Sequence, residues 1–254
     1  MCIMLWACQD SSPKSEADVI ISECIKAHGG KAYNKARFAY EFRDKTYTYD
    51  YNRGKYEYER MFIHTTGNAV RDVLTNSNFE RYIDGKLVQL SDEKSKAYSN
   101  SVNSVNYFAF LPFFLKDKAV TSKYIGTENI RNQSYDKIKV TFSEEGGGDD
   151  FNDVYVYWIH QENKTMDYLA YSYDQPDDKG VRFRSAYNPR TVADIRFQDY
   201  VNYKHDADTP VEELGALYDE GKLTELSRIE LKTWMLSSKR SVMVSFAIFP
   251  IDTM

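Results

Sequence analysis

The residues best suited to chemistry form an acidic segment in the middle of the chain. It spans residues 143–153 and holds five carboxylates, which are Glu144, Glu145, Asp149, Asp150 and Asp153. Carboxylate oxygens are the ligands that calcium prefers, but this spacing differs from that of an EF-hand loop. Three consecutive glycines favour a flexible, solvated hairpin loop over a preformed site. We therefore predict no metal here.

The histidines offer no clearer reactive set. His28, His64, His160 and His205 fall in four separate expected elements, without the spacing of metal ligands. The chain also lacks the GxSxG, HExxH, CxxC, dinucleotide-loop and phosphate-loop motifs. A hydrolase with a dispersed site would need an acid beside His160 or His64. We predict neither catalysis nor a cofactor.

Three arginines, Arg182, Arg184 and Arg196, lie on neighbouring expected strands. On a shared sheet face they could meet an anionic head group, since guanidinium binds carboxylate and phosphate well. Pairing with Asp194 and Asp199 would instead make them an ordinary solvated face. The sequence favours this second interpretation.

The composition favours extended structure. The 254 residues include 21 Tyr and 14 Phe, and aromatic residues are enriched in strands. A formal net charge of −5, with scattered lysines and arginines, argues against a nucleic-acid partner. The three cysteines, Cys2, Cys8 and Cys24, all lie near the start, so no disulfide framework spans the fold.

The first residues contain Leu5-Trp6-Ala7-Cys8, followed by a polar stretch. This order resembles a bacterial lipobox, in which the cysteine becomes the acylated first residue of the mature protein. The segment before Cys8 is shorter than a usual signal sequence and has no basic residue. An accidental match in a frayed terminus is the alternative. We predict that residues 1–16 are a signal-peptide remnant, lipobox and tether, with Cys8 lipidated.

The remaining chain is expected to alternate strands with a few helices. Ser15 caps a first helix that ends at Gly29-Gly30, with His28 in its last turn complementing the helix dipole. A second helix is expected to end near Pro112. Strands are expected at 36–42, 47–51, 56–62, 69–75, 79–83, 86–90, 120–124, 126–130, 135–142, 154–160, 166–173, 181–187, 192–203 and 226–232, and a third helix at 211–220. Residues 188–190 are expected to form a turn.

The densest apolar run is Tyr107-Phe-Ala-Phe-Leu-Pro-Phe-Phe-Leu115. So apolar a segment must be buried in a core, or cover a cavity that another molecule fills. An aromatic plug that completes the core and a lid over an apolar ligand both fit, and they are compatible.

The order of these elements resembles the lipoprotein-sorting factors of the LolA/LolB-like group. The resemblance rests on the lipobox, on Ala27-His28-Gly29-Gly30 and on the helix that runs into Tyr107–Pro112. An uncharacterised family of Bacteroidetes lipoproteins is more similar still, with its LPF, KVTFSEEGGG and DYLAYSY stretches at 111–113, 139–148 and 167–173. The resemblance covers residues 17–233.

The resemblance implies a mainly β (α+β) fold, in which a curved antiparallel sheet forms an incomplete barrel plugged by two or three helices. It also implies an apolar cavity for acyl chains and no catalytic residues. We expect one domain over residues 17–233, with residues 234–254 as an atypical tail or an extra strand. The expected ligand-binding residues are Phe108, Phe110, Leu111, Phe113, Phe114, Trp158 and Tyr171.

The expected function is that of an outer-membrane lipoprotein, periplasmic or surface-exposed, which binds a lipid or other hydrophobic ligand and is anchored by its acyl group. The alternative is a structural or scaffold lipoprotein with a filled core. In that case its tyrosine-rich sheet face would bind a protein or a glycan. The sequence identifies neither a protein partner nor the ligand.

Overall fold

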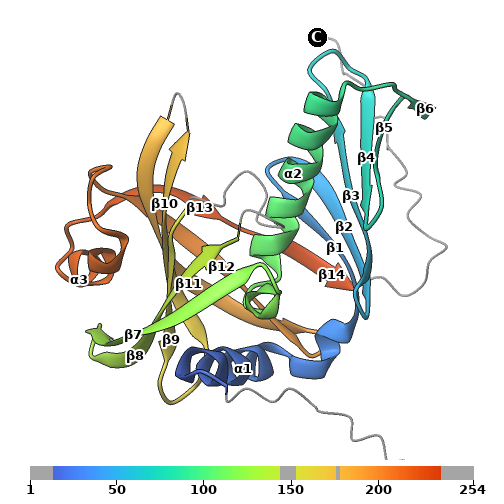
Figure 1. The fold of residues 1–254 in the computed structure, drawn as a ribbon. Coiled ribbons are helices and arrows are strands. Elements are labelled where there is room, and N and C mark those ends of the chain that lie inside the picture. The colour runs from blue at the N-terminus through green and yellow to red at the C-terminus, as the bar shows by residue number, and fades with distance from the viewer. Residues whose placement is uncertain (1–13, 144–152, 176–177, 236–254) are drawn as a thin grey trace, which may run out of the picture.

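A computed structural model describes residues 14–143, 153–175 and 178–235. In these residues two antiparallel sheets of seven strands each accompany three α-helices and three short 3₁₀ helices. The sheets diverge from a common base, and helix α2 lies in the space between them (Figure 1). The expected class, a mainly β protein with an open antiparallel half-barrel, is confirmed.

The first sheet is a meander with one added strand, in the order β14-β1-β2-β3-β4-β5-β6. Its strands are β1 (Lys35–Phe42), β2 (Lys45–Asn52), β3 (Lys55–Ile63), β4 (Ala69–Thr75), β5 (Phe79–Ile83), β6 (Lys86–Leu87) and β14 (Lys232–Met235). Alternating aromatic residues place Tyr40, Tyr49 and Tyr58 on the buried face. The strand expected at 86–90 is shorter than predicted.

The second sheet has the order β13-β12-β11-β10-β9-β8-β7. Its strands are β7 (Val120–Ile130), β8 (Gln133–Phe142), β9 (Tyr155–His160), β10 (Met166–Gln175), β11 (Asp178–Val192), β12 (Ile195–Lys204) and β13 (Thr224–Ile229). Every residue of β9 is buried, as its apolar sequence on both faces predicts.

Two of the expected breaks in this sheet are wrong. Residues 188–190 do not turn the chain, because β11 continues through them with a register shift between Tyr187 and Arg190. A bulge lets the strand absorb Pro189, which has no N–H to donate. Likewise, β7 is one strand with a shift between Tyr124 and Thr127. Bulges and turns favour the same residue types, so the sequence alone did not distinguish these two bulges from turns.

The single strand expected at 226–232 is also wrong, because the chain changes sheets there. Strand β13 pairs with β12 of the second sheet, and β14 then pairs with β1 of the first. Glu230 and Leu231 make this crossing. Trp234 and Met235 belong to β14, and residues 236–254 lie outside the described part of the chain.

Helix α1 packs on the second sheet, and two further α-helices and three 3₁₀ helices follow it in the described residues. Helix α1 (Glu16–His28) begins at a capping box in which Ser15 and Asp18 exchange hydrogen bonds of 3.0 and 3.1 Å. It packs on the second sheet, where His28 Nε2 accepts a 3.0 Å hydrogen bond from the Met166 N–H. Helix α2 is Asp92–Ala109, α3 is Leu214–Asp219, and the 3₁₀ helices are Gly30–Asn34, Phe113–Lys116 and Val211–Glu213.

The apolar core divides into two clusters on opposite faces of the second sheet. The larger fills the space between the sheets and holds the buried face of α1, including Cys24 with no exposed surface. The smaller lies on the outer face, beneath α3. The expected dipole role of His28 is wrong, because burial, assisted by Arg196, lowers its pKa to about 3 and leaves it uncharged.

The lipobox with Cys8, and residues 144–152 of the acidic segment, lie outside the described residues. None of the helices in the described ranges combines the length and apolar character needed to cross a membrane.

Candidate ligand-binding groove

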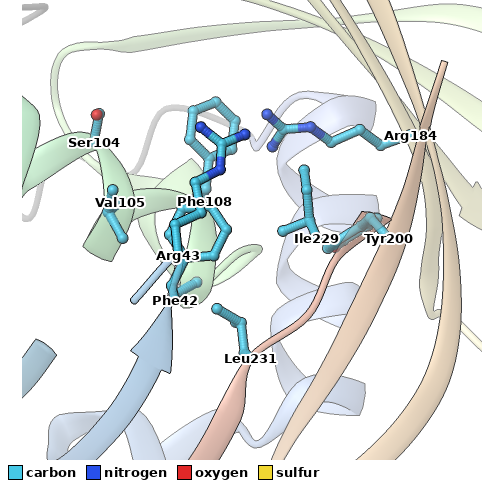
Figure 2. Close-up of a pocket in the computed structure, with 10 residues that line it drawn as sticks. Phe42, Arg43, Ser104, Val105, Phe108, Arg184, Tyr200, Ile229 and Leu231 are labelled. Carbon is cyan, nitrogen blue, oxygen red and sulfur yellow. The ribbon is translucent and has the colours of Figure 1, made fainter. Parts of the chain in front are cut away.

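A groove opens where the end of α2 meets the second sheet (Figure 2). It has a volume of about 200 Å³. Most ligand pockets measure roughly 300–1,000 Å³, so the groove suits a small group or one end of a longer molecule. Its lining residues are Phe42, Arg43, Ser104, Val105, Phe108, Ala109, Arg184, Tyr200, Ile229 and Leu231.

Three parts of the fold meet at this groove. Helix α2 supplies Val105 and Phe108, which stand near each other because residues three or four apart share a helix face. The end of β1 and its tight turn supply Phe42 and Arg43. Ile229 ends β13 and Leu231 lies in the crossing between the sheets, so both sheets contribute to the groove.

Polar contacts fix α2 to the first sheet. The Tyr40 hydroxyl donates a 2.8 Å hydrogen bond to Asn106 Oδ1, and both side chains are buried. Arg60 Nη1 donates to the Ser101 hydroxyl at 2.7 Å. Hydrogen bonds between buried groups are directional and costly to leave unmade, so they set the rotation of the helix about its axis.

Aromatic contacts join α2 to the second sheet. The Phe108 ring lies 6.2 Å from that of Tyr155 and 6.0 Å from that of Tyr171, measured between centroids. The Arg184 guanidinium carbon lies 4.7 Å from the Phe108 ring centroid. Phe108 is half-buried and separates the groove from the aromatic interior.

The other predicted residues of the apolar run pack inside the core. The rings of Phe110 and Tyr49 stack with centroids 3.6 Å apart, and those of Phe113 and Tyr33 stack at 4.7 Å. The exposed fractions of these residues and their neighbours are 0% for Phe110, 5% for Leu111, 1% for Phe113 and 8% for Phe114. The run therefore divides into a plug, Phe110–Leu115, and a groove wall at Phe108.

Trp158 does not join the groove. It lies on the outer face of β9, where its indole N–H donates a 2.8 Å hydrogen bond to Glu128 and its ring packs against Gly215 of α3. A period-two pattern cannot tell the inner face of a strand covered on both sides from the outer face. Tyr171 lies behind Phe108 and does not line the groove itself.

Arg184 is the predicted arginine that reaches the groove. Its Nη2 donates a 3.1 Å hydrogen bond to the Tyr171 hydroxyl, while its buried Nε finds no hydrogen-bond partner within the described ranges. Burial raises the pKa of Tyr200, a second wall residue, to about 12, so its hydroxyl keeps its proton at neutral pH.

The expected pairing of the arginines with Asp194 and Asp199 is wrong in the described residues. Asp199 pairs instead with Arg190, with 3.0 Å between Arg190 Nη1 and Asp199 Oδ1. Arg182 stacks on Tyr173 and donates to its hydroxyl, on the same strand face as Arg184.

Sequence reasoning missed Arg43, Val105, Tyr200, Ile229 and Leu231. Arg43 resembles an ordinary turn residue, and its backbone φ of 47° confirms the turn. Ile229 and Leu231 fall in a segment that the sequence assigned to one edge strand. The helical spacing of Val105 and Phe108 was the only available signal.

The histidines have local partners. His160 Nδ1 accepts from the Glu162 and Asn163 N–H groups at 3.1 Å each, and His64 Nδ1 contacts the Thr66 hydroxyl at 2.9 Å. Within residues 14–143, 153–175 and 178–235, no three His, Cys, Asp or Glu side chains are grouped to hold a metal ion.

Comparison with solved structures relates the fold to known proteins. A LolA superfamily protein from Nitrosomonas europaea superposes with a TM-score of 0.52 at 9% sequence identity, over 89% of this chain and 96% of that one. This match shows a shared fold. A DUF1329 family protein from Desulfovibrio piger has a TM-score of 0.40 at 7% identity, with 87% and 94% of the two chains covered. The lipoprotein LppX from Mycobacterium tuberculosis gives 0.27 at 13%, over 60% and 87%.

Comparison of sequences gives the family. No curated protein matches this chain. The model of the family of unknown function DUF6503 matches residues 1–231, which include both sheets up to the crossing and all the groove residues. The chain therefore belongs to the DUF6503 family, and it adopts the fold of a LolA superfamily protein.

Proposed function

We propose that the protein binds a lipid or another apolar molecule at the groove between α2 and the second sheet. The observation that carries this proposal is an apolar wall, made by Phe42, Val105, Phe108, Ile229 and Leu231, at the junction of the two sheets. Burying one such side chain against a ligand contributes about 1.5–3 kcal/mol, so a few contacts are enough for micromolar affinity.

Phe108 decides how far a ligand could enter. The groove is small as it stands, and the Phe108 ring closes it toward Tyr155 and Tyr171. A rotation of this side chain would open the groove toward Tyr155 and Tyr171. Phe108 thus acts as the lid, with Tyr171 behind it, while the Phe110–Leu115 plug supports the wall.

The location follows from the lipobox resemblance. In this proposal Cys8 carries an acyl anchor, and the protein works at the bacterial outer membrane without catalysing a reaction. The fold shared with a LolA superfamily protein supports a place in the cell envelope. Treatment of whole cells with radiolabelled palmitate tests the anchor, since Cys8→Ala should abolish label incorporation.

Native mass spectrometry tests ligand binding. The full chain, produced in a Gram-negative host and purified without detergent, should carry adducts that organic extraction releases as lipid. Phe108→Asp should remove the adducts, because a charge on the wall opposes an apolar ligand. Phe62→Asp, at a half-buried ring on the first sheet that does not line the groove, should keep them. Equal loading of the two variants would contradict the proposal.

A second candidate is a scaffold whose tyrosine-rich surface binds a protein or a glycan. The close packing of Phe110 on Tyr49 and of Phe113 on Tyr33 favours it, because these rings already fill the middle of the half-barrel. A clean apo mass, with no uptake of added lipid, would favour this second candidate.

A further inference from the structure

Two arginines that face the groove pair with no carboxylate of the described residues. Figure 2 shows the guanidinium groups of Arg43 and Arg184 turned toward each other in front of Phe108. Both line the groove, although they come from different sheets. In the described part of the chain, no Asp or Glu oxygen lies within 4.0 Å of either guanidinium. Two like charges placed this way repel each other, so a bound anion would relieve the repulsion.

Two buried donors lie on the second sheet near the Arg184 guanidinium. Arg184 Nε and the Tyr157 hydroxyl are both buried, and neither has a hydrogen-bond partner among the residues that the structure describes. Tyr157 itself has no exposed surface. Arg184 lies near enough to oppose the rise that burial causes in the Tyr157 pKa. A buried donor without an acceptor costs free energy, and an anionic oxygen would satisfy it.

The two sides of the site differ in polarity. Phe42 and Arg43 also line a second, polar groove of about 470 Å³. Its charged residues are Glu41, Arg43, Asp44, Lys45, Arg228, Glu230 and Lys232. Arg43 therefore stands where an apolar wall gives way to a charged one, as the head group of an amphiphile requires.

We propose that Arg43 and Arg184 bind the carboxylate or phosphate of an anionic amphiphile whose hydrocarbon chain lies along Val105, Phe108, Ile229 and Leu231. Guanidinium groups bind both anions through paired, charge-assisted hydrogen bonds. The proposal deepens the proposed function and rests on it, since it assumes an apolar ligand in this groove. It adds the chemical class of the head group.

Calorimetry of the full chain with ligands of equal chain length tests the proposal. Dodecanoate and dodecyl phosphate should bind at least about tenfold more tightly than methyl dodecanoate, all below their micelle concentrations. If none of the three binds, the proposed function fails. If the ester binds as tightly as the acids, the head-group proposal is overturned while the proposed function stands. Inorganic phosphate that binds as tightly as dodecyl phosphate would also overturn it.

Substitutions then locate the anion site. Arg43→Met and Arg184→Met should each remove most of the preference for the acid over the ester, and Arg184→Lys should restore part of it. Arg182→Met is the matched control, since Arg182 occupies the same face of β11 two residues away and does not line the groove. Circular dichroism confirms that each variant is folded. A preference that survives in both methionine variants would overturn the proposal.

Discussion

The Arg60 guanidinium donates two hydrogen bonds to one carboxylate oxygen of Asp72, at 2.9 and 2.7 Å. Arg81 binds the same carboxylate from β5, with 2.6 Å between its Nε and Asp72 Oδ1. Asp72 has no exposed surface. Arg60 also reaches Ser101, and Arg81 lies 3.5 Å from the Tyr98 ring centroid, so this one carboxylate orders the arginines that hold α2 on the first sheet.

We expect Asp72→Asn to lower the free energy of unfolding by about 3–5 kcal/mol, because it leaves the buried Arg60 and the partly buried Arg81 without a counter-charge. Urea unfolding followed by circular dichroism measures this loss. Asp50→Asn is the control, since Asp50 forms a partly exposed pair with Arg37 at 3.3 Å and should cost less than about 1 kcal/mol. Similar losses for the two variants would contradict the assigned role.

The buried hydrogen bond between Tyr40 and Asn106 should show strong coupling. Tyr40→Phe and Asn106→Ala should each cost about 1–3 kcal/mol, because each leaves a buried polar group without its partner. The double variant should cost less than the sum of the two, by about 0.5–3 kcal/mol. A denaturant series on all four proteins completes the cycle, and strict additivity would exclude a direct interaction.

Stability should fall as the pH is lowered through the range in which His28 is protonated in the unfolded chain but neutral in the folded protein. Its pKa is about 3 in the fold and 6.5 in the unfolded chain, so the unfolded chain takes up the proton first. The contribution of neutral His28 is therefore complete above about pH 6.5 and is lost toward pH 3, at up to about 1.4 kcal/mol per pH unit.

Unfolding curves between pH 7 and pH 4 measure this slope. His28→Gln keeps an acceptor for the Met166 N–H and should flatten the slope. His64→Gln, at an exposed histidine, should leave the slope in place. An unchanged slope in His28→Gln would show that another group causes the acid sensitivity.

A substitution in the smaller apolar cluster, beneath α3, should lower stability without affecting ligand binding. A Cβ at residue 215 would lie 2.9 Å from the Trp158 ring, so Gly215→Ala should destabilise the protein by about 1–3 kcal/mol. Lipid loading measured at a temperature where the variant stays folded should match that of the unchanged chain. Reduced loading would place Trp158 in the binding machinery after all.

Local signals in the sequence predicted much of the fold. The capping residue Ser15 and the stop at Gly29 gave α1, and apolar residues on both faces gave β9 as a covered strand. Such features depend only on residues that are close in the chain, so they can be read from the sequence. The alternating tyrosines of β1 to β3 likewise indicated which face of the first sheet is buried.

The groove could not be predicted in the same way, because it depends on contacts between distant segments. Phe108 and Phe110 are two residues apart, yet one lines the groove and the other has no exposed surface. The rotation of α2, set by Asn106 and Ser101 through partners on β1 and β3, decides between them. The crossing at Leu231 depends on strand pairing across the two sheets, which no local pattern encodes.

The two walls of the groove are attached to different sheets. Leu231 is tied to the second sheet, because its N–H donates a 3.0 Å hydrogen bond to Asp199 and its carbonyl accepts from Arg190. The opposite wall, at Val105 and Phe108, belongs to α2, which polar contacts hold to the first sheet. The width of the groove therefore follows from how the two sheets are placed, and a molecule that fills it would contact parts held by both.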